Sequence, residues 1–342
     1  MVKTVGIVSL SSGVLGESFV AHELKIGEER LRALGLSVKY MPHAKMGIAY
    51  LRAHPEVRAA DLLAAFRDPE VDMILCAIGG DDTYKLAPYL FENDALQKAV
   101  TDKIFLGFSD TTVNHFMLHK VGLPTFYGQA FLPDVCEIGA DMLPYTRRYF
   151  EELIRTGHIA AVTPSDIWYE TRKDFGADQV GTAMPAYKND GFELLRGHAR
   201  FEGEILGGCM DTIFDMFDGT RYADMPDVIR RYGLFPAAGA WRGKILLLES
   251  SEEKPSPEKY RRALEYLRDA GVFAAVSGVL VGKPMDDTHH AAYKQALLDV
   301  IPDKELPVVC NLSVGHAQPR CILPFGVHAT VDADTQRITF AF

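Results

Sequence analysis

Short apolar runs alternate with amphipathic stretches along the first half of the chain, and most of the apolar runs stop at glycine or at a small polar residue. Continuous runs such as 71–78 are typical of strands that are buried on both faces. The stretches between them repeat apolar residues at helical spacing. The strands are expected at 3–9, 37–41, 71–78 and 104–108, and the helices at 17–35, 56–67 and 110–120. Strands that alternate with helices predict an α/β domain with a mainly parallel, doubly wound sheet over residues 1–160.

This periodicity weakens between 161 and 198, where the sequence is polar, mixed in charge and interrupted by glycine and proline. We expect a connecting segment here, with 170–192 as a possible lid, because long connections in compact proteins are usually functional or disordered. A second α/β unit is expected over 199–342. Its strands are expected at 203–206, 244–248, 276–282 and 307–311, its helices at 210–217, 257–270 and 290–300, and a closing hairpin at 327–332 and 337–342.

Composition narrows the class of protein. A chain of 342 residues exceeds the size at which one hydrophobic core keeps growing, so two domains are expected. A net charge of −10 makes nucleic acid and anionic membranes poor partners. The five cysteines show no C-x-x-C spacing, which suits buried thiols in a reducing cytoplasm. No run approaches the ~18 apolar residues of a membrane span, and the N-terminus lacks the features of a secretion signal.

The most informative local feature is Ser109, which follows the apolar run 104–108 and precedes a predicted helix. Free backbone N–H groups and the helix dipole favour a developing negative charge at such a position. The segment is similar to the nucleophile elbow G-x-S-x-G, although Thr111 stands at the fifth position. The same serine could also be a plain helix N-cap.

Three other segments end apolar strands with groups that acyl transfer requires. Glu249 closes the run 244–248, His316 follows the strand at 307–311, and Gly79-Gly80 follows the strand at 71–78. Each has a structural alternative: a glutamate turning to water, a packed histidine or a tight turn. Together with Ser109 they predict a nucleophile, a base and an orienting carboxylate, with backbone amides of the glycine turn and of Asp110 as an oxyanion hole.

Two other classes of function remain open at this point. One is a two-domain protein that closes on a small ligand without catalysis. The other is a metal-dependent hydrolase, because His115 and His119 are spaced i,i+4 on one helix face, although no third ligand lies nearby. A dinucleotide site is disfavoured because neither Gly79-Gly80 nor Gly207-Gly208 extends to G-x-G-x-x-G.

The combination of motifs resembles the LD-carboxypeptidase and microcin-immunity (MccF-like) serine peptidases. The resemblance spans about residues 5 to 340. The matching segments, in order along the chain, are IGGDDTY at 78–84, GFSDTT at 107–112, LGG at 206–208, LLESSE at 247–252, GHAQP at 315–319 and LPFG at 323–326.

The resemblance implies a Ser–His–Glu triad of Ser109, His316 and Glu249, with an oxyanion hole from the amides of Gly80 and Asp110. It implies a Rossmann-like N-terminal domain, a smaller strand-rich C-terminal domain, a homodimer, and neither metal nor organic cofactor. Classical LD-carboxypeptidases release the terminal D-alanine of murein tetrapeptides. The MccF-like branch cleaves an amide between an acidic aminoacyl or peptidyl group and a nucleotide-like moiety.

The residues favour the MccF-like branch. The segments at 78–84 and 247–252 look like that branch, which stacks a tryptophan on the nucleobase from a loop that matches the long segment here. In this chain the matching position carries Phe192, and Cys209 stands where many members have asparagine. We expect the small-molecule substrate to contact residues at five positions, which are Gly79, Asp81, Phe192, Gly208 and Cys209.

Overall fold

The computed structural model describes residues 1–342, which form two compact units. The first unit comprises 1–158 and 172–184, and the second comprises 159–171 and 185–342. The predicted α/β class is confirmed. The two units are equal in length, so the second is not the smaller one that we expected. No helix is both long enough and apolar enough to cross a bilayer.

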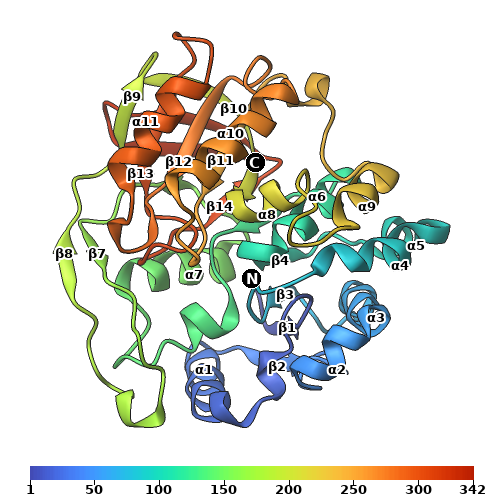
Figure 1. The fold of residues 1–342 in the computed structure, drawn as a ribbon. Helices are drawn as coiled ribbons and strands as arrows, with labels where there is room; N and C mark the ends of the chain where they lie inside the picture. The colour runs from blue at the N-terminus through green and yellow to red at the C-terminus, as the bar shows by residue number, and fades with distance from the viewer. The chain divides into compact units, whose positions relative to one another are not determined.

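The first unit is built on a parallel sheet whose strands run in the order β5-β4-β3-β1-β2 (Figure 1). Its strands are β1 (Thr4–Val8), β2 (Ser37–Tyr40), β3 (Met73–Cys76), β4 (Ile104–Gly107) and β5 (Thr125–Tyr127). Its helices are α1 (Ala21–Ala33), α2 (Ile48–Ala53), α3 (Pro55–Arg67), α4 (Ala87–Phe91), α5 (Ala95–Ala99), α6 (Thr112–Lys120) and α7 (Pro144–Thr156). This order reverses between β1 and β3, and doubly wound sheets bind ligands at such a reversal, beyond the carboxyl ends of the strands.

The second unit is built on a mixed sheet in the order β6-β16-β15-β10-β11-β12-β13-β9. The strands β10 to β13 are parallel to one another, and the pairings outside them are antiparallel. Their bounds are β6 (Ala161–Val162), β9 (Glu193–Arg196), β10 (Arg200–Cys209), β11 (Lys244–Glu249), β12 (Gly278–Gly282), β13 (Val308–Leu312), β15 (His328–Asp332) and β16 (Arg337–Ala341). The predicted closing hairpin is therefore confirmed as β15 and β16.

Helices α8 (Met210–Asp215), α9 (Met225–Tyr232), α10 (Pro257–Asp269) and α11 (His290–Val300) and the strand β14 (Leu323–Phe325) complete the second unit. Helices α10 and α11 lie side by side, with the rings of Tyr260 and Tyr293 stacked at 4.0 Å between centroids. The second half of β10 (205–209) and most of β11, β12 and β13 are apolar and buried, which is what burial on both faces requires, whereas the first half of β10 alternates between exposed and buried residues.

The segment 161–198, expected to be a connection, holds several short strands. Strands β7 (Ile167–Tyr169) and β8 (Ala186–Lys188) form an antiparallel ribbon, drawn in yellow-green in Figure 1. Residues 172–184 belong to the first unit, where Arg172 pairs with Glu137 at 2.8 Å and the amide of Gly181 donates to the carbonyl of Ile138 at 2.7 Å. Strands of two to four residues are too short to produce a readable periodicity. That this segment moves as a lid stays a prediction.

Candidate active site

The strand β4 leads directly into the predicted nucleophile turn. Phe108 is extended, Ser109 has a φ of 68°, and a 3-10 turn (Ser109–Thr111) then opens α6. A positive φ is uncommon for a residue other than glycine, and such strained conformations cluster at functional sites. The conformation is that of a sharp strand-to-helix turn, as in a nucleophile elbow, and Ser109 is 9% exposed there. The N-cap position of this turn is Phe108, so Ser109 is the first residue of the turn and not the helix N-cap that the sequence also allowed.

The Gly79-Gly80 turn lies against this serine within the first unit. A Cβ at Gly79 would stand 2.5 Å from the Cβ of Ser109 and 2.7 Å from its Oγ, and 3.2 Å from the amide nitrogen of Asp110. Gly80 has a φ of 124°, and a Cβ there would meet Ser12 at 2.7 Å. Only glycine fits at both positions without displacing a neighbour. The turn therefore brings its backbone close to the hydroxyl of Ser109 and the amide of Asp110.

The carboxyl of Asp110 is buried behind the turn, where it accepts a hydrogen bond from the amide of Thr83 at 3.0 Å. Burial raises its pKa to about 7, although hydrogen bonds from Ser11 and Thr83 oppose this. Near neutral pH the carboxyl is therefore protonated in about half of the molecules. This matters for an oxyanion hole, because a full negative charge at this place would oppose the charge that develops on the substrate.

A buried ion pair joins the glycine turn to the loop after β1. The guanidinium of Arg58 is completely buried and lies 2.8 Å from the carboxylate of Asp82, and it donates to the carbonyl of Leu10 at 3.0 Å. Asp82 itself has a φ of 59° and also pairs with Lys85 at 2.9 Å. Helix α3 thereby fixes both loops that border the reversal in strand order.

Replacing Arg58 with methionine is expected to lower the free energy of unfolding by about 3 kcal/mol, because it leaves the buried carboxylate of Asp82 without its main partner. Arg52 is the matched control: it is 66% exposed and lies 3.6 Å from Asp81, so Arg52→Met is expected to cost less than about 1 kcal/mol. Urea unfolding of both variants measures the difference. Equal stabilities of the two variants would contradict the role given to Arg58.

In the second unit, the structure brings Glu249 and His316 together. The Nδ1 of His316 lies 2.7 Å from the Oε2 of Glu249, which also accepts the backbone N–H of His316 at 3.1 Å. Glu249 is 1% exposed at the end of β11. Gly315 permits the approach, because a Cβ there would lie 2.3 Å from the carboxylate of Glu249. A carboxylate so placed fixes the ring orientation and the proton on Nδ1.

A second carboxylate, which ends the motif at 247–252, contacts the other ring nitrogen of His316. The Oε2 of Glu252 lies 2.8 Å from the Nε2 of His316. Burial alone would lower the pKa of His316, but the charge of Glu249 and hydrogen bonds to both carboxylates outweigh it and raise the pKa to about 10. The only sequence signal for Glu252 is its position three residues after Glu249.

Cys209 lies beside this pair, because β10 and β11 place it opposite Glu249 in register. Its Sγ, a carboxylate oxygen of Glu249 and a ring nitrogen of His316 all lie within 4.8 Å of one another. Burial raises the pKa of this thiol well above its usual range, so the thiol is neutral. These three ligand types could hold a soft metal ion, but the hydrogen bond between His316 and Glu249 accounts for their closeness. The expectation of a metal-free site stays a prediction.

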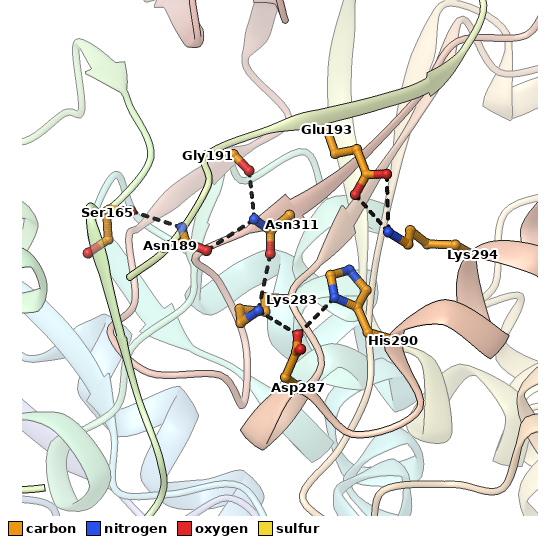
Figure 2. A network of polar contacts seen from close by, with 9 residues as sticks. All are labelled: Ser165, Asn189, Gly191, Glu193, Lys283, Asp287, His290, Lys294 and Asn311. Atoms are coloured by element: carbon orange, nitrogen blue, oxygen red, sulfur yellow. Dashed lines mark hydrogen bonds and ion pairs between the residues drawn. The ribbon is translucent and has the colours of Figure 1, made fainter. Parts of the chain in front are cut away.

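Asparagine side chains fix the strand that leads to His316 (Figure 2). Asn311 in β13 has a φ of 66°, a conformation that asparagine tolerates better than most residues. Its amide donates to the side chain of Asn189 at 3.0 Å and to the carbonyl of Gly191 at 2.6 Å, and its oxygen faces Lys283 at 3.5 Å. The end of β13, which leads into the loop of His316, is therefore held in place by the hydrogen bonds of the Asn311 side chain.

The buried ammonium of Lys283 links this network to the β7–β8 ribbon. It pairs with Asp287 at 2.6 Å and lies 4.9 Å from the ring centroid of Trp168. Trp168 stacks on Tyr187, with 4.5 Å between the centroids. Because Tyr187 is exposed, the ribbon presents an aromatic side chain to solvent.

The remaining candidates fall in different places. Phe192 is only 6% exposed, and its backbone amide donates to Gln336 at 2.6 Å. Asp81 is partly exposed beside Gly80, and Gly208 is buried in β10 with a φ of 134°. His115 uses both ring nitrogens inside the first unit, at 2.7 Å from Thr125 and 3.1 Å from the carbonyl of Gly107. That engagement argues against the metal-dependent alternative built on His115.

Comparison with known proteins decides the family. The family model of the LD-carboxypeptidase N-terminal domain matches residues 5–128, and that of the LD-carboxypeptidase C-terminal domain matches 202–331. A putative carboxypeptidase of Treponema pallidum is 31% identical over 91% of this chain and 85% of its own length. The chain belongs to the LD-carboxypeptidase family. The predicted class of enzyme, a serine-type carboxypeptidase, is thereby confirmed.

Two further relatives connect the chain to the microcin-immunity branch of the LD-carboxypeptidase family. The crystal structure of an MccF-like protein from Streptococcus pneumoniae, in complex with AMP, is 58% identical and covers 100% of this chain and 99% of its own, with a TM-score of 0.99. The microcin C7 self-immunity protein MccF of Escherichia coli is 26% identical over 82% of this chain and 77% of its own length. The resemblance inferred from the motifs is confirmed.

Proposed function

We propose that this LD-carboxypeptidase family member hydrolyses an amide in a small peptidyl or aminoacyl-nucleotide substrate by means of a Ser109–His316–Glu249 triad. The observation that carries the proposal is the buried hydrogen bond of 2.7 Å between His316 and Glu249. The strained conformation of Ser109 in the other unit supports it. The meeting of Ser109 with His316 is part of the proposal.

Each group has a defined task in the proposed reaction. The Oγ of Ser109 attacks the amide carbonyl while its proton passes to the Nε2 of His316, and Glu249 stabilises the imidazolium. The amides of Gly80 and Asp110 hold the oxyanion, with each such donor contributing roughly 3–4 kcal/mol to lowering the barrier. His316 then returns the proton to the leaving nitrogen, and water releases the acyl group from Ser109 by the reverse sequence.

The substrate class rests on the relatives. The structure of the Streptococcus pneumoniae relative is a complex with AMP, which favours an aminoacyl nucleotide for this chain as well. A murein tetrapeptide is the second candidate, because a probable murein peptide carboxypeptidase of Bacillus subtilis is 28% identical over 88% of this chain. Gly79, Asp81, Gly208 and Cys209 stay predicted substrate contacts. The homodimer, the cytoplasmic location and the lack of a cofactor also stay predictions.

The deciding experiment offers both substrates to the purified protein. One is a murein tetrapeptide, assayed for released D-alanine, and the other is an aspartyl–AMP conjugate joined through an amide nitrogen, assayed for released aspartate. We expect hydrolysis of the conjugate with a higher kcat/KM. Binding of the conjugate without turnover of either compound would favour the non-catalytic binding protein instead.

The nucleobase would need an exposed aromatic surface, and we propose the β7–β8 ribbon for this role beside the predicted Phe192. Trp168 and Tyr187 are already stacked, with 20° between the ring planes, and Tyr187 is 44% exposed. A third flat ring can extend such a stack. The buried ring of Phe192 would first have to be uncovered.

Replacing Tyr187 with alanine is expected to raise KM for the aspartyl–AMP conjugate about tenfold and to leave kcat nearly unchanged, since stacking on a base is worth about 1–3 kcal/mol. The KM for a conjugate that lacks the nucleobase should not change when Tyr187 is replaced with alanine. Phe192→Leu is the comparison variant, and we expect its KM to stay close to that of the unmodified protein. The opposite pattern would assign the base to Phe192, as the sequence analysis predicted.

A further inference from the structure

His316 is held at both ring nitrogens by carboxylates that differ in character. Glu249, on the Nδ1 side, is 1% exposed and is also fixed by the backbone N–H of His316. Glu252, on the Nε2 side at 2.8 Å, has a side chain that is 57% exposed. It lies on the loop that follows β11, three residues after Glu249. One carboxylate is thus built into the core, and the other reaches the ring from the surface.

This arrangement conflicts with the resting state that a general base requires. Because Nδ1 is committed to Glu249, only Nε2 can take the proton of the serine hydroxyl. In the structure Nε2 faces a carboxylate, which accepts a hydrogen bond and therefore requires a proton on that nitrogen. A ring that carries a proton on each nitrogen is a cation and cannot act as a base.

We propose that Glu252 is an internal, displaceable carboxylate that occupies the Nε2 of His316 and keeps the unliganded enzyme in an inactive form. This inference rests on the proposed function and adds a positioning residue to it. When substrate enters, Glu252 leaves, the Nε2 proton of His316 passes to solvent, and the neutral ring then accepts the proton of Ser109. No covalent bond other than these N–H and O–H bonds changes in the activation step.

The surroundings of His316 make Glu252 the replaceable partner. Glu249 on β11 and the neutral thiol of Cys209 on β10 are buried. Arg320 donates to the carbonyls of Gly315 and, at 3.4 Å, of His316, which belong to the backbone of the loop. Among these groups only Glu252 is exposed, and it can move to solvent without leaving a buried charge behind.

Arg221 is the other charge that acts on Glu252. Burial opposes ionisation of Glu252, but the hydrogen bond and charge of His316, a backbone hydrogen bond and the charge of Arg221 together lower its pKa to about 2. Glu252 is therefore an anion at every pH at which the enzyme is expected to work. The ion pair between Glu252 and His316 is therefore broken by movement of the Glu252 side chain and not by protonation of Glu252.

The test is Glu252→Gln, which keeps the shape of the side chain and removes its charge. Loss of a negative charge beside the ring disfavours imidazolium, so the pKa of His316 falls and the neutral base persists to lower pH. We expect the acidic limb of the kcat/KM profile to move down by at least about one pH unit, which is about a tenfold gain at pH values below the limb. Glu253 is the exposed neighbour, and the pH profile of kcat/KM for Glu253→Gln should coincide with that of the unmodified protein.

A profile of Glu252→Gln that coincides with the unmodified protein, or a kcat/KM that falls at every pH, would overturn the inference. A second measurement does not depend on turnover. The 15N resonances of His316 can be assigned by their loss in His316→Gln. Their titration midpoint should move to lower pH in Glu252→Gln and should stay at the value of the unmodified protein in Glu253→Gln. If neither substrate is hydrolysed, the proposed function fails, and this titration alone still decides whether Glu252 controls the ring.

Discussion

Replacing Ser109 with alanine is expected to abolish hydrolysis, by a factor on the order of 10⁴ or more, while the protein stays folded and still binds its substrate. The loss is large because the hydroxyl is the only group in the turn placed to form an acyl intermediate, and the remaining oxyanion donors and binding contacts give only residual catalysis. Alanine has the same backbone restriction as serine at a φ of 68°, so the turn keeps its existing strain rather than acquiring more.

Three measurements separate a lost nucleophile from a lost fold. Turnover of the aspartyl–AMP conjugate should disappear, its affinity measured by calorimetry should persist, and the urea midpoint should stay within the error of the unmodified protein. Ser37→Ala, at an exposed serine in β2, is the control and should leave all three unchanged. Turnover of Ser109→Ala comparable to that of the unmodified protein would remove the triad from consideration.

The positions of the proposed catalytic residues at the ends of strands could be predicted from local pattern alone. An apolar run that stops at a glycine and is followed by a helical stretch gives both the strand and the turn after it, as at Gly107 and Ser109. The same reasoning placed Glu249 at the end of β11 and His316 beyond β13. These predictions succeed because buried parallel strands require continuous apolar sequence, which is a strong and local signal.

The contacts that tune these groups could not be predicted in this way. Glu252 stands in a charged stretch that is indistinguishable in sequence from a solvated turn, and only the curvature of the loop after β11 brings it to His316. Arg58 and Asp82 are far apart in sequence, and each alone resembles a surface charge. Such ion pairs depend on where the charged ends of long side chains lie in the folded structure. The spacing of the residues along the sequence does not indicate this.

Phe192 illustrates the limit of reasoning by type of residue. The resemblance to the MccF-like branch placed a base-stacking ring at Phe192, and this role stays a prediction, although the ring is only 6% exposed in the structure. The aromatic pair that meets solvent, Trp168 and Tyr187, lies on a ribbon of two three-residue strands. Aromatic residues are favoured both in cores and at binding sites, so composition cannot separate the two roles.

Glu249→Gln is expected to lower kcat by about 10³ to 10⁴ with little change in KM, because it alters the proton arrangement on His316 rather than the shape of the site. Glutamine is nearly isosteric with the carboxylate but presents one oxygen and one NH₂ group. The Oε2 of Glu249 now accepts both the Nδ1–H and the backbone N–H of His316. If the NH₂ group faces Nδ1, that nitrogen must become the acceptor, and the proton of the neutral ring moves to Nε2, where it blocks attack by serine.

The charge change acts in the same direction. Glu249 contributes to the raised pKa of His316, so its loss destabilises the imidazolium that forms when Ser109 gives up its proton. Glu249→Gln and Glu252→Gln therefore both lower the pKa of His316, yet they are expected to have opposite effects on turnover. In the proposed mechanism Glu249 stabilises the charged ring at the moment of reaction, whereas Glu252 stabilises it before substrate arrives. Glu202→Gln, at an exposed position on β10, controls for a general effect of charge, and a kcat of Glu249→Gln within tenfold of the unmodified protein would exclude Glu249 as the orienting acid.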